Sequence, residues 1–329
     1  MFNFIKRGDE LMRYTEEQLK RFAEPLSITE DEQCHRAINM IKESLEKIGY
    51  KKEGQTQKIY SDLPYYKINM VSENQYDLTI FVQGSYANNT NVKGDSDIDI
   101  AVVRENVFRG EYRTGISSKN YGFQPAKHDA LEFKKIIFKA LYDKFGNDTV
   151  MKNKSILIKG NYSRKQADVV PSLRYRNYKQ DYYNDKNNFK PGVLITTDDG
   201  QEIINYPEIH LENGREKNIN TNYYFKKIVR IMKELKYLME EEGYNSASKI
   251  SSFLIESLLW NVPDDLFLIE GDYSKKFIEI VNYLLDNKEN IIQFKEVNGV
   301  KLLIEDDEER LGISKNFLTD LLEFCIYEE

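Results

Sequence analysis

The chain has 329 residues and a mass of 38.8 kDa, which exceeds one average domain of about 150 residues and excludes a small scaffold stapled by disulfides. Its 47 lysines and arginines against 54 acidic residues give a formal charge of −7, so the surface as a whole does not attract nucleic acid. This total charge does not exclude a local basic cleft. Hydrophobic residues at 40% and charged residues at 31% describe a folded, water-soluble chain.

The cysteines and the N-terminus bear on the cellular compartment. Cys34 and Cys325 are far apart and lack metal-ligand spacing, so neither a disulfide framework nor a zinc site is indicated. The first 13 residues mix apolar and charged side chains, unlike a signal peptide, and no run reaches the roughly 18 apolar residues of a membrane span. We therefore expect a cytoplasmic monomer with no membrane partner.

The first half of the chain predicts a long helix followed by strands. Thr29 and Glu32 fit a capping box, and apolar residues then recur at helical spacing up to Ile48. Residues 69–83 and 97–103 have the apolar pattern of strands, and a connection rich in glycine and asparagine joins them. We expect a further helix over 131–145, paired strands at 155–158 and 166–170, and a hairpin around an Asp-Gly turn within 192–205.

The last third of the chain predicts mainly helices. Apolar residues from Phe225 to Met239 form one helical stripe, and 251–260 and 275–285 predict two more helices. No linker rich in proline or glycine separates the halves, so we expect two packed lobes. The predicted division is a core lobe with the N-terminal helix over 1–205 and a helical C-terminal lobe over 206–329, which makes the fold class α+β.

Two aspartates carry the strongest chemical signal. Asp97 and Asp99 alternate with Ile98 and Ile100, so in a strand both carboxylates share one face with Cα atoms about 6.7 Å apart. That spacing lets the side chains hold a pair of metal ions about 3.5 to 4 Å apart. A bare Asp-x-Asp pattern is more often two solvated acids on a strand, so the surrounding residues decide between these interpretations.

The surrounding residues favour a site for phosphates and metals. Gly84 and Ser85 end the preceding strand, where a small residue lets the backbone approach a phosphate and the hydroxyl adds a donor. Asp168 lies in an apolar stretch, which is unusual unless a charged ligand faces it. Carboxylate oxygens without histidine or cysteine suit Mg²⁺ or Mn²⁺, which would bridge the acids and a nucleoside triphosphate.

This combination of Gly-Ser, Asp-x-Asp and a third Asp resembles the DNA polymerase β-like nucleotidyltransferase superfamily. The longer segment 83–100, Q-G-S-Y-A-N-N-T-N-V-K-G-D-S-D-I-D-I, resembles the cGAS/DncV-like nucleotidyltransferases (CD-NTases), bacterial enzymes that make cyclic oligonucleotide signals in CBASS anti-phage defence. Segments 204–222 and 253–263 resemble clade E, the CdnE-like members, and the resemblance extends over roughly 14–263. It implies a polymerase β-like core with a mixed sheet, a helical C-terminal lobe and an active site in the cleft.

The resemblance implies roles for individual residues. Asp97 and Asp99 would bind two Mg²⁺ or Mn²⁺ ions, and Asp168 would bind the catalytic metal and help to deprotonate the attacking ribose hydroxyl. The residues that would bind the nucleotide phosphates are Gln83, Gly84, Ser85, Lys233 and Ser252.

Four other residues are open to more than one interpretation. Lys226 and Arg230 share one helical stripe with the predicted phosphate-binding lysine, and such a stripe is either a nucleotide or RNA contact or an ordinary solvated face. Tyr86 and Tyr175 are the nearest candidates for stacking on a nucleobase, although buried tyrosines more often serve packing.

The function implied by the resemblance is the condensation of two NTPs into a cyclic dinucleotide that activates a separate effector. Some relatives are switched on by phage-derived RNA, so RNA is a candidate activator. Two rival hypotheses remain: a transferase that makes a linear product on RNA or protein, and a catalytically silent sensor of RNA or nucleotides. Some clade E members that use uracil carry an Asn about five residues after the third Asp, where this chain has Leu173, so the resemblance favours a product with purines.

Overall fold

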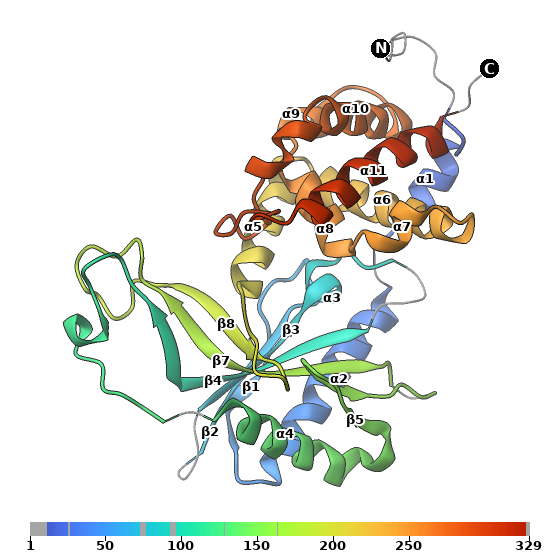
Figure 1. Ribbon diagram of the computed structural model, residues 1–329. Helices are drawn as coiled ribbons and strands as arrows, with labels where there is room; N and C mark the ends of the chain where they lie inside the picture. The colour runs from blue at the N-terminus through green and yellow to red at the C-terminus, as the bar shows by residue number, and fades with distance from the viewer. Residues whose placement is uncertain are drawn as a thin grey trace. The chain divides into compact units, whose positions relative to one another are not determined.

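The computed structural model describes residues 12–25, 27–72, 77–92, 97–127, 129–162 and 164–326. These residues form two compact units (Figure 1). One unit consists of the described residues within 27–211, and the other joins 12–25 to 212–326. Each unit has its own hydrophobic core, so each is described separately.

One mixed sheet organises the unit of residues 27–211. In the described part of this unit, the sheet has nine strands, and seven of them follow the order β1-β2-β3-β4-β7-β6-β5. The other two extend from β7: β8 pairs with β7, and β9 pairs with β8. Strands β4 and β7 are parallel, and the other described pairings are antiparallel. The strands are β1 (Lys51–Lys58), β2 (Tyr66–Val71), β3 (Leu78–Gln83), β4 (Ile98–Glu111), β5 (Thr149–Met151), β6 (Ile156–Ile158), β7 (Ala167–Asn177), β8 (Lys190–Thr196) and β9 (Glu202–Asn205).

Helices α2 (Ile28–Glu46) and α4 (Ala130–Phe145) pack on each other and on the same side of this sheet (Figure 1). Their apolar faces meet the alternating apolar residues of the central strands, which confirms both predicted helices and the predicted strands. The short elements of the unit are α3 (Gly84–Asn88), η1 (Ser118–Tyr121) and η2 (Gly146–Asp148).

The predicted start of α2 is wrong by two residues. Ser27, not Thr29, is the N-cap: its Oγ accepts the backbone N–H of Glu30, and the Glu30 carboxylate accepts the Ser27 N–H. Both Ser27-x-x-Glu30 and Thr29-x-x-Glu32 fit the capping-box pattern. The helix uses the earlier match, and the buried face from Cys34 onward is the same in either register.

The second unit is helical. Its elements are α1 (Glu16–Phe22), α6 (Tyr224–Glu241), α7 (Asn245–Lys249), α8 (Ser252–Trp260), α9 (Asp264–Leu268), α10 (Tyr273–Asp286), η3 (Lys288–Gln293) and α11 (Glu308–Cys325), and the boundary between the units falls inside α5 (Pro207–Asn220). The three helices predicted in this part of the chain are confirmed as α6, α8 and α10. Among the described residues, no helix combines the length and the apolar character needed to cross a membrane.

Candidate active site

Two carboxylates face each other across the parallel strands β4 and β7. Asp99 pairs in register with Asp168, and Asp97 lies just before the first residue of β4. Ile98 and Ile100, which alternate with the acids, have no exposed surface. The structure therefore confirms that the isoleucines enter the core while the acids take the other face, and it brings all three acids to one end of the strand pair.

The Gly-Ser motif lies beside Asp99. Strand β3 places Gln83 opposite Asp99 and ends there, and α3 begins with Gly84 and Ser85. Gly84 has a φ of +69°, and a Cβ at this position would overlap Oδ2 of Asp99. Only glycine satisfies both the left-handed backbone and the close approach. The connection rich in glycine and asparagine therefore starts with a short helix whose first residue lies against the carboxylate of Asp99.

The three carboxylates form a concentration of negative charge. Burial, together with the charges of Asp168 and Asp97, raises the pKa of Asp99 to about 7, and the ammonium of Lys152 acts in the opposite direction. Like charges at this separation disfavour each other's ionised form, and a bound cation relieves that repulsion. The electrostatics of the site therefore favour a divalent cation.

The donor set fits a metal that is shared with a substrate. Among the described residues, no group of three or more His, Cys, Asp or Glu side chains could hold a metal ion by itself. Mg²⁺ in nucleotide enzymes keeps water ligands and takes one or two carboxylates together with substrate phosphates, so a complete protein cage is not required. Asp99 beside Asp168, with Asp97 next to them, matches that arrangement.

Three polar side chains that we did not predict bind the acids. The amide Nε2 of Gln166 lies 2.9 Å from each carboxylate oxygen of Asp97. The ammonium of Lys152 lies 3.2 and 3.4 Å from the two oxygens of Asp168, and Oγ of Ser155 lies 3.3 Å from one of them. No local pattern in the sequence marks these contacts, because the tertiary fold creates them.

The helical unit holds Lys233 and Ser252 on neighbouring helices. Lys233, on α6, is 2% exposed, and its ammonium lies 3.5 Å from the carboxylate of Glu256 on α8. Glu256 follows Ser252 by one helical turn, so Lys233 contacts the face of α8 that begins with Ser252. Burial lowers the pKa of Lys233, and Glu256 opposes that shift.

Ser252 is the first residue of α8, where backbone N–H groups without partners in the helix favour an anion. The preceding Ser251 is the N-cap, and its hydroxyl accepts the N–H of Leu254. The structure thus places the lysine and the serine that the resemblance assigns to a triphosphate on two neighbouring helices of one unit. Both lie in a different unit from the three acids.

Of the two interpretations of the cationic stripe on α6, the ordinary solvated face is wrong. Lys226 and Arg230 are 3% and 4% exposed, so both side chains are buried. The guanidinium of Arg230 donates from Nε and Nη2 to the carbonyl oxygen of Ala23, at 2.8 and 2.6 Å. Arg230 therefore holds the end of α1.

The two tyrosines proposed as base-stacking platforms are also buried. Tyr86 has no exposed surface, and its hydroxyl contacts the ammonium of Lys165. Tyr175 is 4% exposed, and its hydroxyl donates to Glu111 at 2.7 Å. Both rings serve packing, so the prediction that they stack on a base is wrong.

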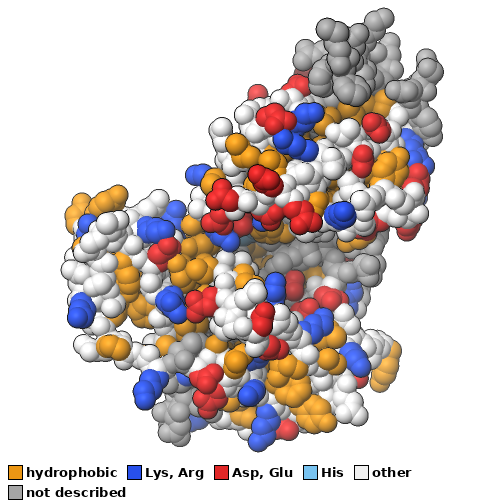
Figure 2. All heavy atoms as spheres, viewed as in Figure 1, with side chains coloured by type: hydrophobic (Ala, Val, Ile, Leu, Met, Phe, Trp, Pro, Cys, Tyr) orange, Lys and Arg blue, Asp and Glu red, His pale blue; other side chains and the backbone are white. Residues whose placement is uncertain are grey.

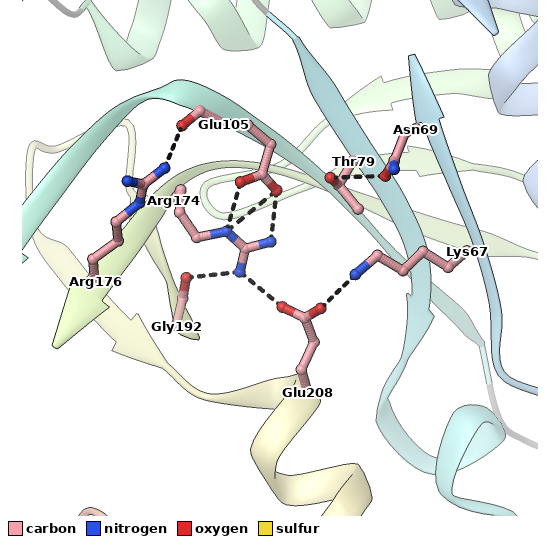
Figure 3. A network of polar contacts seen from close by, with 8 residues as sticks. All are labelled: Lys67, Asn69, Thr79, Glu105, Arg174, Arg176, Gly192 and Glu208. Atoms are coloured by element: carbon pink, nitrogen blue, oxygen red, sulfur yellow. Dashed lines mark hydrogen bonds and ion pairs between the residues drawn. The ribbon is translucent and has the colours of Figure 1, made fainter. Parts of the chain in front are cut away.

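A second polar network lies farther along β7 (Figure 3). The buried guanidinium of Arg174 donates to both carboxylate oxygens of Glu105, to Glu208 at 2.7 Å and to the carbonyl of Gly192 at 3.1 Å. Lys67 also binds Glu208, at 2.9 Å. Since Glu208 is in the first turn of α5, this network fastens the start of that helix to the sheet.

Comparison with known proteins identifies the family. Residues 212–325 match the model of the cGAS/DncV-like nucleotidyltransferase C-terminal helical domain, and residues 66–162 match a nucleotidyltransferase domain. The chain is 42% identical over 318 residues to the cyclic GMP-AMP synthase CdnE03 of Staphylococcus schleiferi, covering 96% of this chain and 98% of the relative. It is 32% identical to the cyclic dipyrimidine nucleotide synthase CdnE of Cecembia lonarensis, covering 89% and 91%.

A solved structure agrees with this assignment. The CdnE cyclic dinucleotide synthase of Elizabethkingia meningoseptica, solved with GTP and Apcpp, aligns with a TM-score of 0.72 at 28% identity and covers 95% of this chain and 99% of its own. Its fold is the polymerase β-like α+β architecture expected from the sequence. The chain therefore belongs to the cGAS/DncV-like nucleotidyltransferases and is a nucleotidyltransferase of their CdnE group.

Proposed function

We propose that this enzyme condenses two NTPs into a cyclic dinucleotide, using two Mg²⁺ or Mn²⁺ ions bound by Asp97, Asp99 and Asp168. The observation that carries the proposal is the direct pairing of Asp99 with Asp168, with Gly84 against Asp99. The names of the CdnE relatives as cyclic nucleotide synthases support it. The GTP and Apcpp in the Elizabethkingia structure support NTPs as substrates.

The proposed reaction repeats one displacement. Asp168 orients the ribose hydroxyl of one nucleotide and accepts its proton; the oxygen attacks the α-phosphorus of the other nucleotide, and the bond to the β-phosphate breaks to release pyrophosphate. The same displacement within the linear intermediate closes the ring. When bound, the divalent ions neutralise the triphosphate and the leaving pyrophosphate and lower the pKa of the attacking hydroxyl. Gln83, Gly84 and Ser85 hold phosphates beside Asp99, and Lys233 and Ser252 bind the triphosphate.

We propose a product that contains purines. Leu173 is apolar and 5% exposed, so its side chain cannot hydrogen-bond to a uracil as an Asn would. The Staphylococcus schleiferi relative is named for a product with two purines, whereas the Cecembia relative is named for pyrimidines, so the choice of base differs within the group.

We propose that the product is a CBASS signal, made in the cytoplasm and read by a separate cyclic-nucleotide-responsive effector. Phage-derived RNA is the candidate activator. On the face shown in Figure 2, Lys and Arg side chains are interspersed with Asp and Glu and do not form one broad basic surface. On this face, an RNA activator would therefore have to bind locally, and the assay must include RNA.

The test is to incubate the purified enzyme with radiolabelled NTPs, singly and in mixtures, with Mg²⁺ or Mn²⁺, and with and without RNA from phage-infected cells. An Asp97→Ala/Asp99→Ala variant is the control. A phosphatase-resistant product that contains purines is expected. A phosphatase-sensitive product would instead identify a transferase with a linear product, and silence under every condition would contradict the proposal.

A further inference from the structure

Gln166 is bound to Asp97 by the geometry of the sheet. Each residue directly precedes its strand, and the parallel pairing of Ile98 with Ala167 places them side by side. The backbone N–H of Ile98 donates to the carbonyl of Gln166 at 3.0 Å, which fixes this register. The amide then donates to both oxygens of Asp97 at 2.9 Å. A carboxylate accepts about four hydrogen bonds, so Asp97 keeps sites for a metal.

Lys152 reaches Asp168 from a tight turn between β5 and β6. The N–H of Lys152 donates to the carbonyl of Ser155 at 2.9 Å and closes the turn. The ammonium of Lys152 then lies within 3.4 Å of both oxygens of Asp168. Its side chain is 41% exposed, so the ammonium can move away when another cation arrives.

A second lysine fixes this turn. The side chain of Lys134, on α4, is 5% exposed. Its ammonium donates to the carbonyls of Lys152 and Asn153 and to the carboxylate of Asp198. The N–H of Asp198 donates in turn to the side chain of Asn153 at 2.8 Å. A buried charge satisfied by three oxygens holds its partners firmly. The backbone of Lys152 is therefore held in place, and its contact with Asp168 is a built feature of the fold.

We propose that Gln166 and Lys152 act on metal binding in opposite directions. Gln166 is a positioning residue: its neutral amide holds Asp97 in place for the metal without cancelling the charge of the carboxylate. Lys152 is an internal cation that neutralises Asp168 and must be displaced when a divalent ion binds. This inference depends on the proposed role of Asp97 and Asp168 as metal ligands, and it adds the two side chains that set the affinity of the site.

The test is calorimetric titration of the purified full chain with Mn²⁺, alone and with a non-hydrolysable ATP analogue. Gln166→Met keeps the side-chain length and removes the donors, and we expect the Mn²⁺ dissociation constant to rise about tenfold, as for other side chains that orient metal ligands. Lys152→Gln keeps most of the reach and removes the charge. We expect its Mn²⁺ dissociation constant to fall about fivefold, the size expected for losing a half-exposed ion-pair partner.

Lys154 provides the matched control. It is exposed in the same turn, but its charge acts on Asp199, whereas the charge of Lys152 acts on the carboxylates of the site. Lys154→Gln changes the net charge equally, so we expect less than about a twofold change in Mn²⁺ affinity, since separated surface charges are screened by salt.

Each outcome decides a separate point. A Lys152→Gln enzyme that binds Mn²⁺ no more tightly than Lys154→Gln would overturn the role of Lys152. Unchanged affinity in Gln166→Met would overturn the role of Gln166, and Gln166→Asn, which keeps the amide but shortens its reach, repeats the test if Gln166→Met does not fold. If Mn²⁺ binds wild type and Asp99→Asn equally well, or binds neither, the proposed metal site itself is wrong.

Discussion

Asp99 and Asp168 occupy paired positions on two parallel strands, so the hydrogen bonds of the sheet hold two carboxylates together that repel each other. Burial and the charges of Asp168 and Asp97 raise the free energy of the ionised form of Asp99, so this pairing does not stabilise the fold. A site that costs stability and attracts a cation is the usual mark of a functional arrangement. The predictions below test the site and its surroundings.

Removing the charge of Asp99 should make the protein more stable and less active. In EDTA at pH 8, we expect Asp99→Asn to raise the thermal midpoint by about 2–5 °C, because the isosteric amide ends the repulsion by Asp168. Product formation should fall by at least about 10²–10³-fold, since the site loses a metal ligand. Differential scanning calorimetry and a product assay measure both. Asp143→Asn, on the exposed surface of α4, is the charge control, and a lower midpoint for Asp99→Asn would contradict the prediction.

Gly84 should tolerate no side chain. In Gly84→Ala, the new Cβ overlaps Oδ2 of Asp99 and strains a backbone with positive φ, so we expect product formation to fall by about 100-fold or more, as when a catalytic group is displaced by 1 Å. Gly146 also has a positive φ, +57°, but a Cβ there meets nothing within 4 Å. Gly146→Ala should therefore destabilise the protein and leave the rate per folded molecule unchanged. Equal activity losses in the two variants would show that backbone strain, not contact with Asp99, is responsible.

The two cations of α6 should have different effects. Arg230→Met removes the donors to the carbonyl of Ala23, so we expect it to lower the unfolding free energy by about 2–3 kcal/mol while the NTP KM stays near the wild-type value. Lys233→Met/Glu256→Gln removes the ion pair without leaving a buried charge unpaired. In that variant we expect the NTP KM to rise about tenfold, the effect of losing one charged contact to phosphate.

Steady-state kinetics and chemical unfolding of both variants decide this prediction. A normal KM in Lys233→Met/Glu256→Gln would remove Lys233 from the triphosphate site. A raised KM in Arg230→Met at full folding would show that Arg230 also acts on the nucleotide.

The network around Arg174 should make stability depend on acid pH. Burial alone would raise the pKa of Glu208, but Arg174 and Lys67 outweigh burial and hold the pKa below its ordinary value of 4.5. The ionised carboxylate therefore stabilises the folded state above pH 4.5, and this contribution is lost as the pH falls through the lower folded pKa. Glu208→Gln should lower the unfolding free energy by about 2–4 kcal/mol at pH 7 and by less at pH 3.5.

Urea unfolding at the two pH values measures this difference. Glu202→Gln is the matched control, because Glu202 pairs with Arg109 at the surface, where the side chains are 47% and 57% exposed. An exposed pair contributes about 0–1 kcal/mol, so the control should change little at either pH. A Glu208→Gln effect that stays constant between pH 7 and 3.5 would contradict the assigned ionisation.

The sequence pattern was sufficient to predict features that depend on residues close together in the chain. The alternation of Asp97 and Asp99 with isoleucines predicted both the strand and its two faces, because side chains alternate along a strand. The apolar stripe of α6 predicted that helix for the equivalent reason at a period of 3.6 residues. The strand β1 was missed because its residues, K-K-E-G-Q-T-Q-K, are nearly all exposed and lack alternation, and it forms by pairing with β2.

Other errors came from patterns that admit two outcomes. The capping-box pattern fits both Ser27 and Thr29, and the folded helix selects one. A row of cations on α6 has the same sequence whether water or protein covers it. Here Arg230 and Lys233 are buried, and their partners, Ala23 and Glu256, lie on other segments of the chain.

The sequence by itself determined the main secondary-structure elements, the three acids, the Gly-Ser turn and the resemblance to the family, because these depend on residue type and spacing within short segments. Only the tertiary structure decided which charges meet: Gln166 binds Asp97 across 69 residues of chain, and Lys152 binds Asp168 across 16. The physical reason is that strand register and packing bring distant residues together, and no local period in the sequence encodes those contacts.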